Sequence, residues 1–256
     1  MRILALGDVV GQSAIAYLQK HLWSIRTRER IDLAVVNGEN GTDIHGLCTA
    51  DAKMLLESGA DLLTLGNHTY GKRDLYDFLE NDTRIIRPAN YPTTAPGSGY
   101  TILDAAGWRV LCINVSGRVF MEPLNDPFEA VERILSREEG RYDLAVMDIH
   151  AEATSEKLAM ARVFDGRVQV LFGTHTHVQT ADEQILPKGS GYITDLGMCG
   201  PEEGILGTDS EQVIYKLRTS MPTRFEVARG PIRAHGVIFD VDPAAKRVTE
   251  VKRIAF

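Results

Sequence analysis

The sequence predicts an α/β fold, a sandwich built on two β-sheets, and three observations support it. Apolar runs of strand length alternate with segments of helical character through most of the 256 residues. This alternation favours a largely parallel sheet with helices on both faces. Residues 100–104 and 109–115 alternate like a hairpin around Ala106-Gly107, and the C-terminal part reads as consecutive antiparallel strands. No linker rich in Pro, Gly or Ser divides the chain, so we expect one domain over residues 1–256.

The N-terminal part of the chain shows three strand-like runs, at residues 2–7, 31–37 and 62–65. A helix is predicted after each of them, over residues 14–23, 50–58 and 73–79. The second helix has the clearest end signals, because Thr49 is a suitable N-cap and Gly59 a suitable residue just past the last turn. Residues 87–98 are rich in turn formers and are predicted to be a loop.

The later part of the chain continues the same alternation. A helix is expected to start at Asp126-Pro127 and run to about residue 137. A strand over residues 144–149 ends at His150, and a helix capped by Thr154 or Ser155 should run to residue 164. Another strand is expected at residues 168–172, and the last helix at residues 210–218. Three antiparallel strands should follow, at residues 224–228, 233–240 and 247–254.

Bulk properties narrow the functional classes. The net charge of −7 gives no general electrostatic footprint for nucleic acid or an anionic membrane surface. The three cysteines, Cys48, Cys112 and Cys199, are widely spaced and odd in number, which fits a reducing compartment better than a disulfide framework. The N-terminus shows no signal-peptide pattern, and no apolar run has the length of a membrane helix. We therefore expect a cytoplasmic location and no membrane partner.

Polar side chains that can bind metal follow five of the predicted strands. In an open α/β sheet, ligands bind in the crevice beyond the carboxyl ends of the strands. Carboxylate, carboxamide and imidazole groups together suit Mn, Fe or Zn better than a thiolate-preferring metal. The set exceeds the needs of one ion and suits a pair about 3.5–4 Å apart, as used for phosphoester cleavage. Its members are Asp8, Glu39, Asn40, Asn67, His68, His150, His175 and His177.

Each of these residues also has a structural explanation when it is considered alone. Asp8 could cap a helix, and Glu39 could be a solvated loop carboxylate. The amides could hold turns and the imidazoles could be satisfied core groups. The His175-Thr176-His177 sequence is harder to explain in this way, because a strand followed by His-x-His presents two rings on one face. Their coincidence at successive strand ends favours a common site.

Other polar residues near these clusters leave two alternatives open. His45 could contact substrate or belong to a plain surface loop. Glu152 could orient a metal ligand or simply start a helix. Arg87 and Asn90 could line the pocket, although turn chemistry explains Asn90 equally well.

Several motifs together resemble a known family. Asp8, Gly66-Asn67-His68 and the run from Gly173 to His177 resemble the calcineurin-like metallophosphoesterases. The wider set of motifs is similar to the bacterial YmdB-like subfamily over essentially the whole chain. This resemblance implies a four-layer α/β sandwich with two central mixed sheets flanked by helices. It also implies a two-metal phosphodiesterase that acts on cyclic nucleotides such as 2′,3′-cyclic AMP. The motifs are Gly7-Asp8-Val9-Val10-Gly11, Asn37-Gly38-Glu39-Asn40, Gly66-Asn67-His68-Thr69, Arg87-Pro88-Ala89-Asn90, residues 148–157 and residues 173–182.

The same resemblance implies a role for each candidate residue. Two metal ions are expected, with Glu39 bridging them. Fe or Mn is the preferred identity of these ions, and Zn is the second choice. One ion would be held by Asp8, Glu39, Asn40 and His177. The other would be held by Glu39, Asn67, His150 and His175. A hydroxide between the ions would attack phosphorus, and His68 would donate a proton to the leaving oxygen.

The sequence departs from the broader superfamily in three places. Asp8-Val9-Val10 replaces Asp-x-His, so one expected histidine ligand is missing and Asn40 is its substitute. Glu39 replaces the usual bridging Asp. Thr69 stands where an acidic residue often orients the catalytic histidine, so the sequence does not show what orients His68.

Two other functions stay open on the sequence alone. A phosphomonoesterase or protein phosphatase would use the same metal core, because that core does not choose the substrate. A metal- and nucleotide-binding regulator with vestigial activity is the alternative from a different class. The complete ligand set together with His68 favours an enzyme with a small phosphodiester or cyclic-nucleotide substrate. A homo-oligomer is left open, because the sequence does not decide it.

Overall fold

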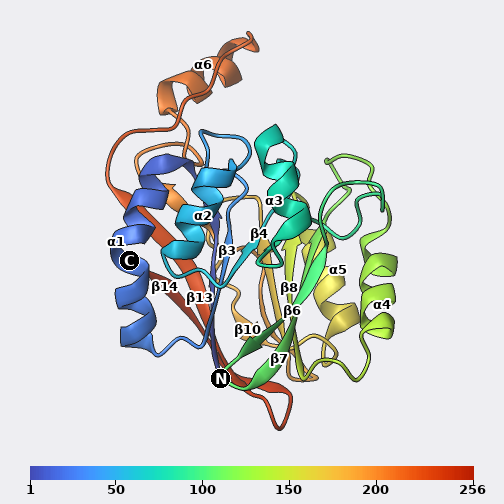
Figure 1. Cartoon of the computed structure of the whole chain (residues 1–256). Helices are drawn as coiled ribbons and strands as arrows, with labels where there is room; N and C mark the ends of the chain where they lie inside the picture. The colour runs from blue at the N-terminus through green and yellow to red at the C-terminus, as the bar shows by residue number, and fades with distance from the viewer.

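The fold is built on two β-sheets that lie face to face in the computed structural model, which describes residues 1–256 (Figure 1). The first sheet contains β1 (Arg2–Leu6), β2 (Asp8–Val9), β3 (Leu33–Asn37), β4 (Leu62–Thr64), β5 (Ile85–Ile86), β12 (Met198–Pro201), β13 (Ile232–Asp242) and β14 (Arg247–Ala255). The second sheet contains β6 (Tyr100–Ala105), β7 (Trp108–Ser116), β8 (Leu144–His150), β9 (Val170–Thr174), β10 (Gln184–Ile185) and β11 (Gly191–Ile193).

Both sheets have a parallel centre with antiparallel additions. In the first sheet β1, β3, β4 and β5 are parallel neighbours, and β13 joins β1 antiparallel with β14 beyond it. In the second sheet β7, β8, β9 and β11 are parallel, with β6 and β10 antiparallel at the two edges. The two mixed sheets confirm the predicted fold class.

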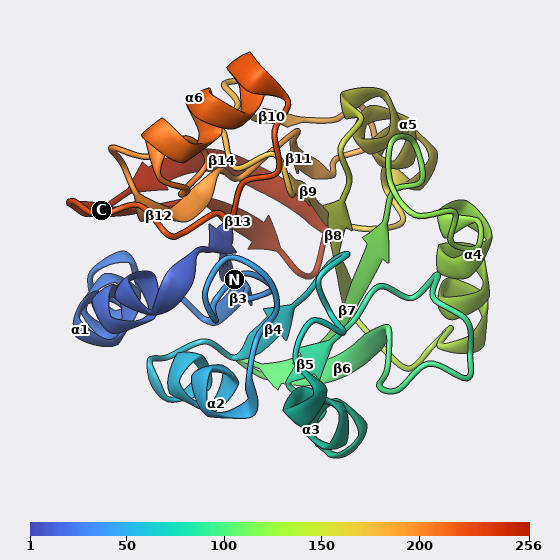
Figure 2. The same ribbon diagram turned by 90° about the horizontal axis from the view of Figure 1, so that it is seen from above.

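Helices cover the outer face of each sheet, as Figure 2 shows from above. The first sheet is covered by α1 (Gly11–Glu29), α2 (Thr49–Glu57) and α3 (Tyr76–Asn81), the last preceded by a 3₁₀ turn over Arg73–Leu75. The second sheet is covered by α4 (Pro127–Arg137) and α5 (Thr154–Phe164). A sixth helix, α6 (Ser210–Thr219), projects from the body of the molecule (Figure 1). The predicted four-layer arrangement of helices, sheet, sheet and helices is therefore confirmed.

The alternation of side chains along β1 shows how the layers are bound together. Ile3 and Ala5 point between the two sheets, and Leu4 and Leu6 point to the core under α1 and α2. Successive side chains of a strand face opposite sides, so a wholly buried strand must be apolar on both faces. The central strands of this chain have that composition, which is why they are recognisable from the sequence.

Some predicted helix ends were wrong. The first helix runs over Gly11–Glu29 and not residues 14–23, because polar residues continue its exposed face at both ends. Cys48, not Thr49, is the N-cap of α2, with its sulfur accepting from the Asp51 N–H. Neither Thr154 nor Ser155 caps α5, whose N-cap is Ala153 without a side-chain hydrogen bond. The helix expected at Asp126-Pro127 does start there, and Asp126 is its N-cap and accepts from the Phe128 N–H at 2.7 Å.

The strand predicted at residues 224–228 is also wrong. This segment forms only an isolated bridge, between Thr208 and Val227. Five short strands were not predicted, and they are β2, β5, β10, β11 and β12. Strands of two to four residues carry no usable hydrophobic period, so only pairing in the folded protein defines them. In the whole chain, no helix combines the length and the apolarity needed to cross a membrane.

Candidate metal centre

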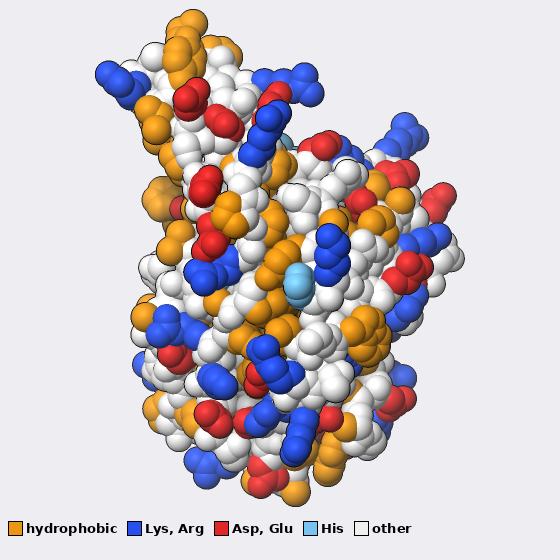
Figure 3. All heavy atoms as spheres, turned by 90° about the vertical axis from the view of Figure 1, so that its left-hand side faces the viewer, with side chains coloured by type: hydrophobic (Ala, Val, Ile, Leu, Met, Phe, Trp, Pro, Cys, Tyr) orange, Lys and Arg blue, Asp and Glu red, His pale blue; other side chains and the backbone are white.

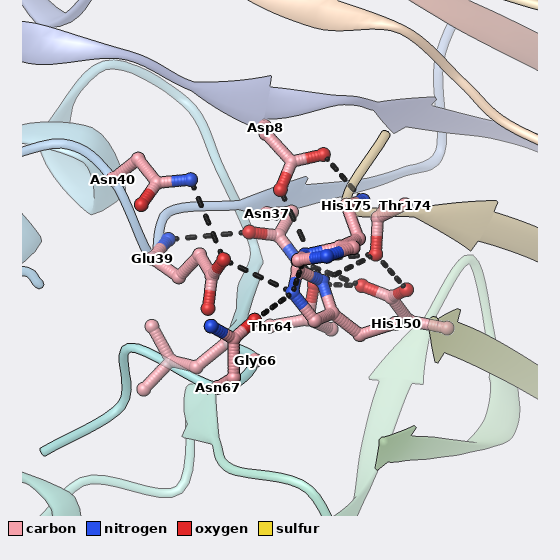
Figure 4. A network of polar contacts seen from close by, with 12 residues as sticks. Asp8, Asn37, Glu39, Asn40, Thr64, Gly66, Asn67, His150, Thr174 and His175 are labelled. Atoms are coloured by element: carbon pink, nitrogen blue, oxygen red, sulfur yellow. Dashed lines mark hydrogen bonds and ion pairs between the residues drawn. The ribbon is translucent and has the colours of Figure 1, made fainter. Parts of the chain in front are cut away.

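The predicted site residues converge at one end of the two sheets, although they come from five separate chain segments. Asp8 opens β2, and Glu39 and Asn40 follow β3. Asn67 and His68 follow β4, His150 ends β8, and the last two histidines follow β9. Within each sheet, parallel strands place their carboxyl ends at a common edge, and the packing of the two sheets brings these edges together. Figure 4 shows most of these side chains pointing toward one another.

One group of contacts surrounds His177. Its Nε2 lies 3.7 Å from Asp8 Oδ1 and 3.3 Å from Asn40 Nδ2. The Asn40 amide also donates to Glu39 Oε1 at 3.4 Å. These contacts connect Asp8, His177, Asn40 and Glu39 in turn, which fits the first predicted ligand set.

A second group of contacts surrounds His150. Its Nε2 lies 3.0 Å from Glu39 Oε1, 3.0 Å from Asn67 Oδ1 and 3.1 Å from His175 Nδ1. One ligand atom each from Glu39, His150 and His175 falls within a 4.8 Å cluster. Glu39 belongs to both groups, which is the position that a bridging carboxylate must occupy.

Hydrogen-bond directions determine which nitrogen His150 offers to the site. The Thr174 hydroxyl donates to Asp148 Oδ1 at 2.7 Å, so its oxygen is left to accept from His150 Nδ1 at 2.8 Å. A neutral His150 that carries its proton on Nδ1 keeps the Nε2 lone pair, on the side of Glu39 and Asn67, available for a metal ion. Asp148 is itself buried and held by Asn37 and Thr64.

The other two histidines are oriented in the same manner from outside the site. His177 Nδ1 donates to the Leu206 carbonyl at 3.0 Å, which leaves Nε2 for Asp8 and Asn40. His175 Nε2 lies 3.1 Å from Glu152 Oε2, which leaves Nδ1 for the cluster. Such outer partners fix the tautomer of metal-binding imidazoles. Glu152 thus takes the ligand-orienting alternative that the sequence left open.

The backbone conformation that directs His175 and His177 toward the cluster was not predicted from the sequence. β9 ends at Thr174, so strand alternation does not place His175 and His177 on one face. Both instead have left-handed backbone, with φ of 93° and 62°. This conformation is costly for residues other than Gly and persists where the surroundings impose it, commonly at functional sites.

The two carboxylates of the site are held ionised although they are buried. Burial alone would raise the pKa of Asp8, but the charges of His177 and His150 hold it well below its usual value. For Glu39, burial is likewise outweighed by the charge and hydrogen bond of His150, and the pKa is lowered to about 2. The buried, ionised carboxylates of Asp8 and Glu39 therefore favour the binding of cations.

The imidazoles supply part of that positive charge in the protein without metal. Burial would lower the pKa of His150, but Glu39 raises it to about 8. Asp8 outweighs burial in the same way at His177 and raises the pKa to about 9. Burial and the charge of His150 lower the pKa of His175 to about 4. Metal binding would replace the protons on the first two rings.

The donor set fits metal ions on two structural grounds. Asp8 Oδ1 and Asn40 Oδ1 are buried and have no hydrogen-bond partner, which is costly unless a cation binds them. Gly66 provides the second ground, because a Cβ at this position would overlap both the His150 ring and Glu39 Oε2. The absent side chain leaves room for close approach of the ligands. Its place in the Gly66-Asn67-His68 motif is the sequence signal for this role, which the sequence argument missed.

His68 lies beside the ligand cluster and not within it. Its backbone N–H donates to Glu39 Oε2 at 2.9 Å, and its half-buried ring stacks on His45 with the centroids 4.3 Å apart. Thr69 does not orient the ring, because its hydroxyl donates to the Gly66 carbonyl at 2.6 Å. His45, which the sequence left between substrate contact and plain loop, is thus the packing partner of His68.

A cleft of about 340 Å³ opens onto the cluster, and His68, His175 and His177 are among its lining residues. A larger hollow of about 650 Å³ lies elsewhere, between α3, α4 and the loop before β6, and contains none of the histidines. Arg87 borders that hollow and donates to backbone carbonyls of its own loop. Asn90 is fully buried and bonds to Ser116 and Asn125, so neither residue lines the cleft at the metal centre.

Comparisons with known proteins agree over nearly the full length. A family model described as YmdB-like protein matches residues 4–254. The chain is 43% identical over 254 residues to a Bacillus subtilis (strain 168) protein named 2′,3′-cyclic-nucleotide 2′-phosphodiesterase, covering 99% of this chain and 96% of that protein. A hypothetical protein from Thermus thermophilus superposes with a TM-score of 0.94 at 39% identity, covering 100% and 99% of the two chains. A Mycoplasma pneumoniae protein described as a novel phosphatase superposes with a TM-score of 0.93 at 34% identity, covering 100% and 93%.

Proposed function

The chain belongs to the YmdB-like protein family and is a phosphoric ester hydrolase, and on that premise we propose that it hydrolyses small phosphodiesters with two bound metal ions. The proposed substrates are cyclic nucleotides such as 2′,3′-cyclic AMP, the class named for the Bacillus subtilis relative. The match to the YmdB-like family model and to the Bacillus subtilis relative confirms the family resemblance seen in the sequence.

One observation carries the two-metal proposal. Two neighbouring groups of oxygen and nitrogen atoms share the carboxylate of Glu39, and two buried oxygens among them have no partner in the protein. We assign one ion to Asp8, Glu39, Asn40 and His177, and the other to Glu39, Asn67, His150 and His175. No cysteine is among these groups, which favours Fe or Mn, with Zn as the second choice. When bound, the ions would stabilise charge on the phosphoryl oxygens and make hydroxide available near neutral pH.

The residues of the chain have distinct tasks in this proposal. Thr174, Leu206 and Glu152 each contact one nitrogen of an imidazole and leave the other nitrogen for a metal ion. His68 is the proton donor for the leaving ribose oxygen, which would otherwise depart as a high-energy alkoxide. Its ring lines the cleft beside the ligands, and its stacking on His45 limits its rotation.

A phosphomonoesterase is the second candidate, because the Mycoplasma pneumoniae relative is described as a phosphatase. The ligand groups alone do not separate the two reactions, since both present phosphoryl oxygens to the metals.

Elemental analysis and a substrate screen test the proposal together. Protein purified without chelator should contain about two transition-metal ions per chain, and it should cleave bis-p-nitrophenyl phosphate and 2′,3′-cyclic AMP faster than p-nitrophenyl phosphate. A metal content near zero after supplementation with Mn²⁺ and Fe²⁺ would refute the metal assignment. Much faster cleavage of the monoester would favour the phosphatase.

A further inference from the structure

The cleft at the metal centre is lined by two kinds of residue. The polar lining residues are Glu39, Asn40, His45, His68, Glu152, His175, Thr176, His177 and Thr208. Three apolar side chains line the same cleft: Ile44, Leu206 and Phe225. We call these three residues the apolar wall. The metal assignments leave them without a role, since none of them offers a ligand or a proton.

One residue of the apolar wall, Leu206, is hydrogen-bonded to the ligand cluster. The Leu206 carbonyl accepts from His177 Nδ1 at 3.0 Å, and Leu206 has left-handed backbone with φ of 53°. A non-Gly residue in this conformation costs free energy and is retained where its surroundings require it. The backbone that orients His177 therefore also carries an apolar side chain at the cleft.

The two segments that flank α6 pair with each other, and Phe225 adjoins this pairing and lines the cleft. Ala228 donates its N–H to the Gly207 carbonyl at 2.9 Å, and Asp209 donates to the Glu226 carbonyl at 3.0 Å. Thr208 and Val227 form the bridge between these two hydrogen bonds. Phe225 is the next residue beyond this paired stretch, so its position is set by the fold.

The chain itself does not cover the apolar wall. Phe225 is 36% exposed and Leu206 is 47% exposed, and α6 between them contributes no buried residue. Figure 3 shows apolar side chains interspersed with charged ones on the projecting part of the molecule. An accessible aromatic face next to a polar phosphate-binding edge is the combination that a nucleotide requires, with the phosphate on one side and the base on the other.

The chemistry of the proposed reaction determines where the base must lie. In a 2′,3′-cyclic nucleotide the phosphorus is joined to both ribose oxygens, and the base is attached to the carbon next to C2′. If His68 protonates the departing oxygen, the ribose and base must remain near His68, in the cleft that the apolar wall also lines. The separate hollow beyond His175, which Phe120 lines, does not contain His68.

Resting on the proposed cyclic-nucleotide substrate, we propose that Phe225, together with Ile44 and Leu206 on the wall of the same cleft, forms the surface on which the substrate base stacks. None of the three side chains can form a hydrogen bond with the edge of a base. The wall therefore accepts any base and favours purines over pyrimidines by their larger stacking area.

Steady-state kinetics with Phe225→Ala test this assignment, with 2′,3′-cyclic AMP compared to glycerol 1,2-cyclic phosphate. The second compound has the same five-membered phosphodiester ring and no base. The ratio of the two kcat/KM values should fall about 5- to 100-fold in the variant, through KM for the nucleotide, as expected from loss of one stacking contact. Phe225→Leu should show most of this loss, and Phe225→Trp should restore the ratio. Equilibrium binding of adenosine 3′-phosphate should weaken in parallel.

Phe120→Ala is the matched control, because Phe120 is a 90% exposed phenylalanine on the other side of His175. This variant should keep the substrate ratio of the wild type. An unchanged ratio in Phe225→Ala and in Phe225→Leu, with normal cleavage of 2′,3′-cyclic AMP by the wild type, would overturn the stacking surface and leave the proposed function intact. A fall confined to Phe120→Ala would overturn it as well. Failure of the metal-loaded wild type to cleave any cyclic nucleotide would refute the proposed function, and the stacking surface with it.

Discussion

Lys157 Nζ lies 2.8 Å from Asp195 Oδ2, and neither side chain is exposed to solvent. The same Asp195 oxygen accepts from the Thr176 hydroxyl at 2.7 Å and from its backbone N–H at 3.2 Å. Thr176 is the residue between His175 and His177, so this buried ion pair supports the strained turn that carries two candidate ligands. Lys157 is part of a recognised motif, but no local pattern connects it with Asp195.

Lys157→Met should destabilise the protein by about 3–5 kcal/mol, since it leaves Asp195 as an unpaired buried charge. The double variant Lys157→Met/Asp195→Asn should recover part of that loss, because the uncompensated charge is then removed. Urea denaturation of the three proteins measures both effects. Equal stability of the single and double variants would show that the carboxylate is not held by Lys157.

Thr174→Val should weaken metal binding about 10- to 100-fold while the fold is retained. The substitution keeps the side-chain shape and removes the hydroxyl that links Asp148 to His150, so the His150 tautomer is no longer fixed. Competition with a chelating dye measures the affinity. Thr174→Ser is the control, and it should bind metal nearly as well as the wild type. Equal metal affinities in both variants would show that the Thr174 hydroxyl does not orient His150.

Gly66→Ala should abolish metal binding, because the new Cβ would overlap the His150 ring and Glu39. Metal content by elemental analysis is the measurement. Gly107→Ala is a suitable comparison, since Gly107 has left-handed backbone with φ of 81°, where Ala is strained, but has no atom within 4 Å of the added group. It should keep its metals. A fully loaded Gly66→Ala protein would show that the ligands do not need this close approach.

The protein without metal should lose stability as the pH rises from about 6.5 to about 9. The pKa values of His150 and His177 are raised in the folded state to about 8 and about 9 by neighbouring carboxylates. A raised pKa contributes stability that is fully present below the unfolded value, near 6.5, and is lost as the pH passes the folded value. The pKa values of Asp8 and Glu39 are lowered, so their contribution does not change in this range.

Urea midpoints of EDTA-treated protein across this pH range measure the effect. His177→Gln should flatten the upper part of the curve, because one of the two titrating rings is then absent. A midpoint that rises with pH in the wild type would contradict the assignment of charge in the site.

His68→Ala should keep both metals and lose turnover by about 10²- to 10⁴-fold on substrates with poor leaving groups, the usual contribution of a positioned acid. The deficit should shrink for bis-p-nitrophenyl phosphate, because p-nitrophenolate departs without a proton. Metal analysis and kinetics on both substrates test this. Loss of metal, or an equal loss on both substrates, would make His68 a ligand or a structural residue.

The sequence by itself determined the layers of the fold and the chemistry at their edge. Runs such as Leu144–His150 are apolar throughout most of their length, and burial on both faces follows from that composition. Polar residues placed directly after parallel strands of one sheet, such as Glu39 and Asn67 in the first sheet, are expected at a common edge. These deductions need only local pattern and strand direction, so no tertiary information was required.

Only the tertiary structure decided how the site is held. The hydrogen bond from His177 to Leu206, the stacking of His45 on His68 and the Lys157–Asp195 pair each join segments far apart in the sequence. No local period encodes such pairings, because they arise when separately folded segments pack. The left-handed turn at His175 and His177 has the same origin, since the free energy that imposes it comes from contacts across the two sheets and not from the residues of the turn.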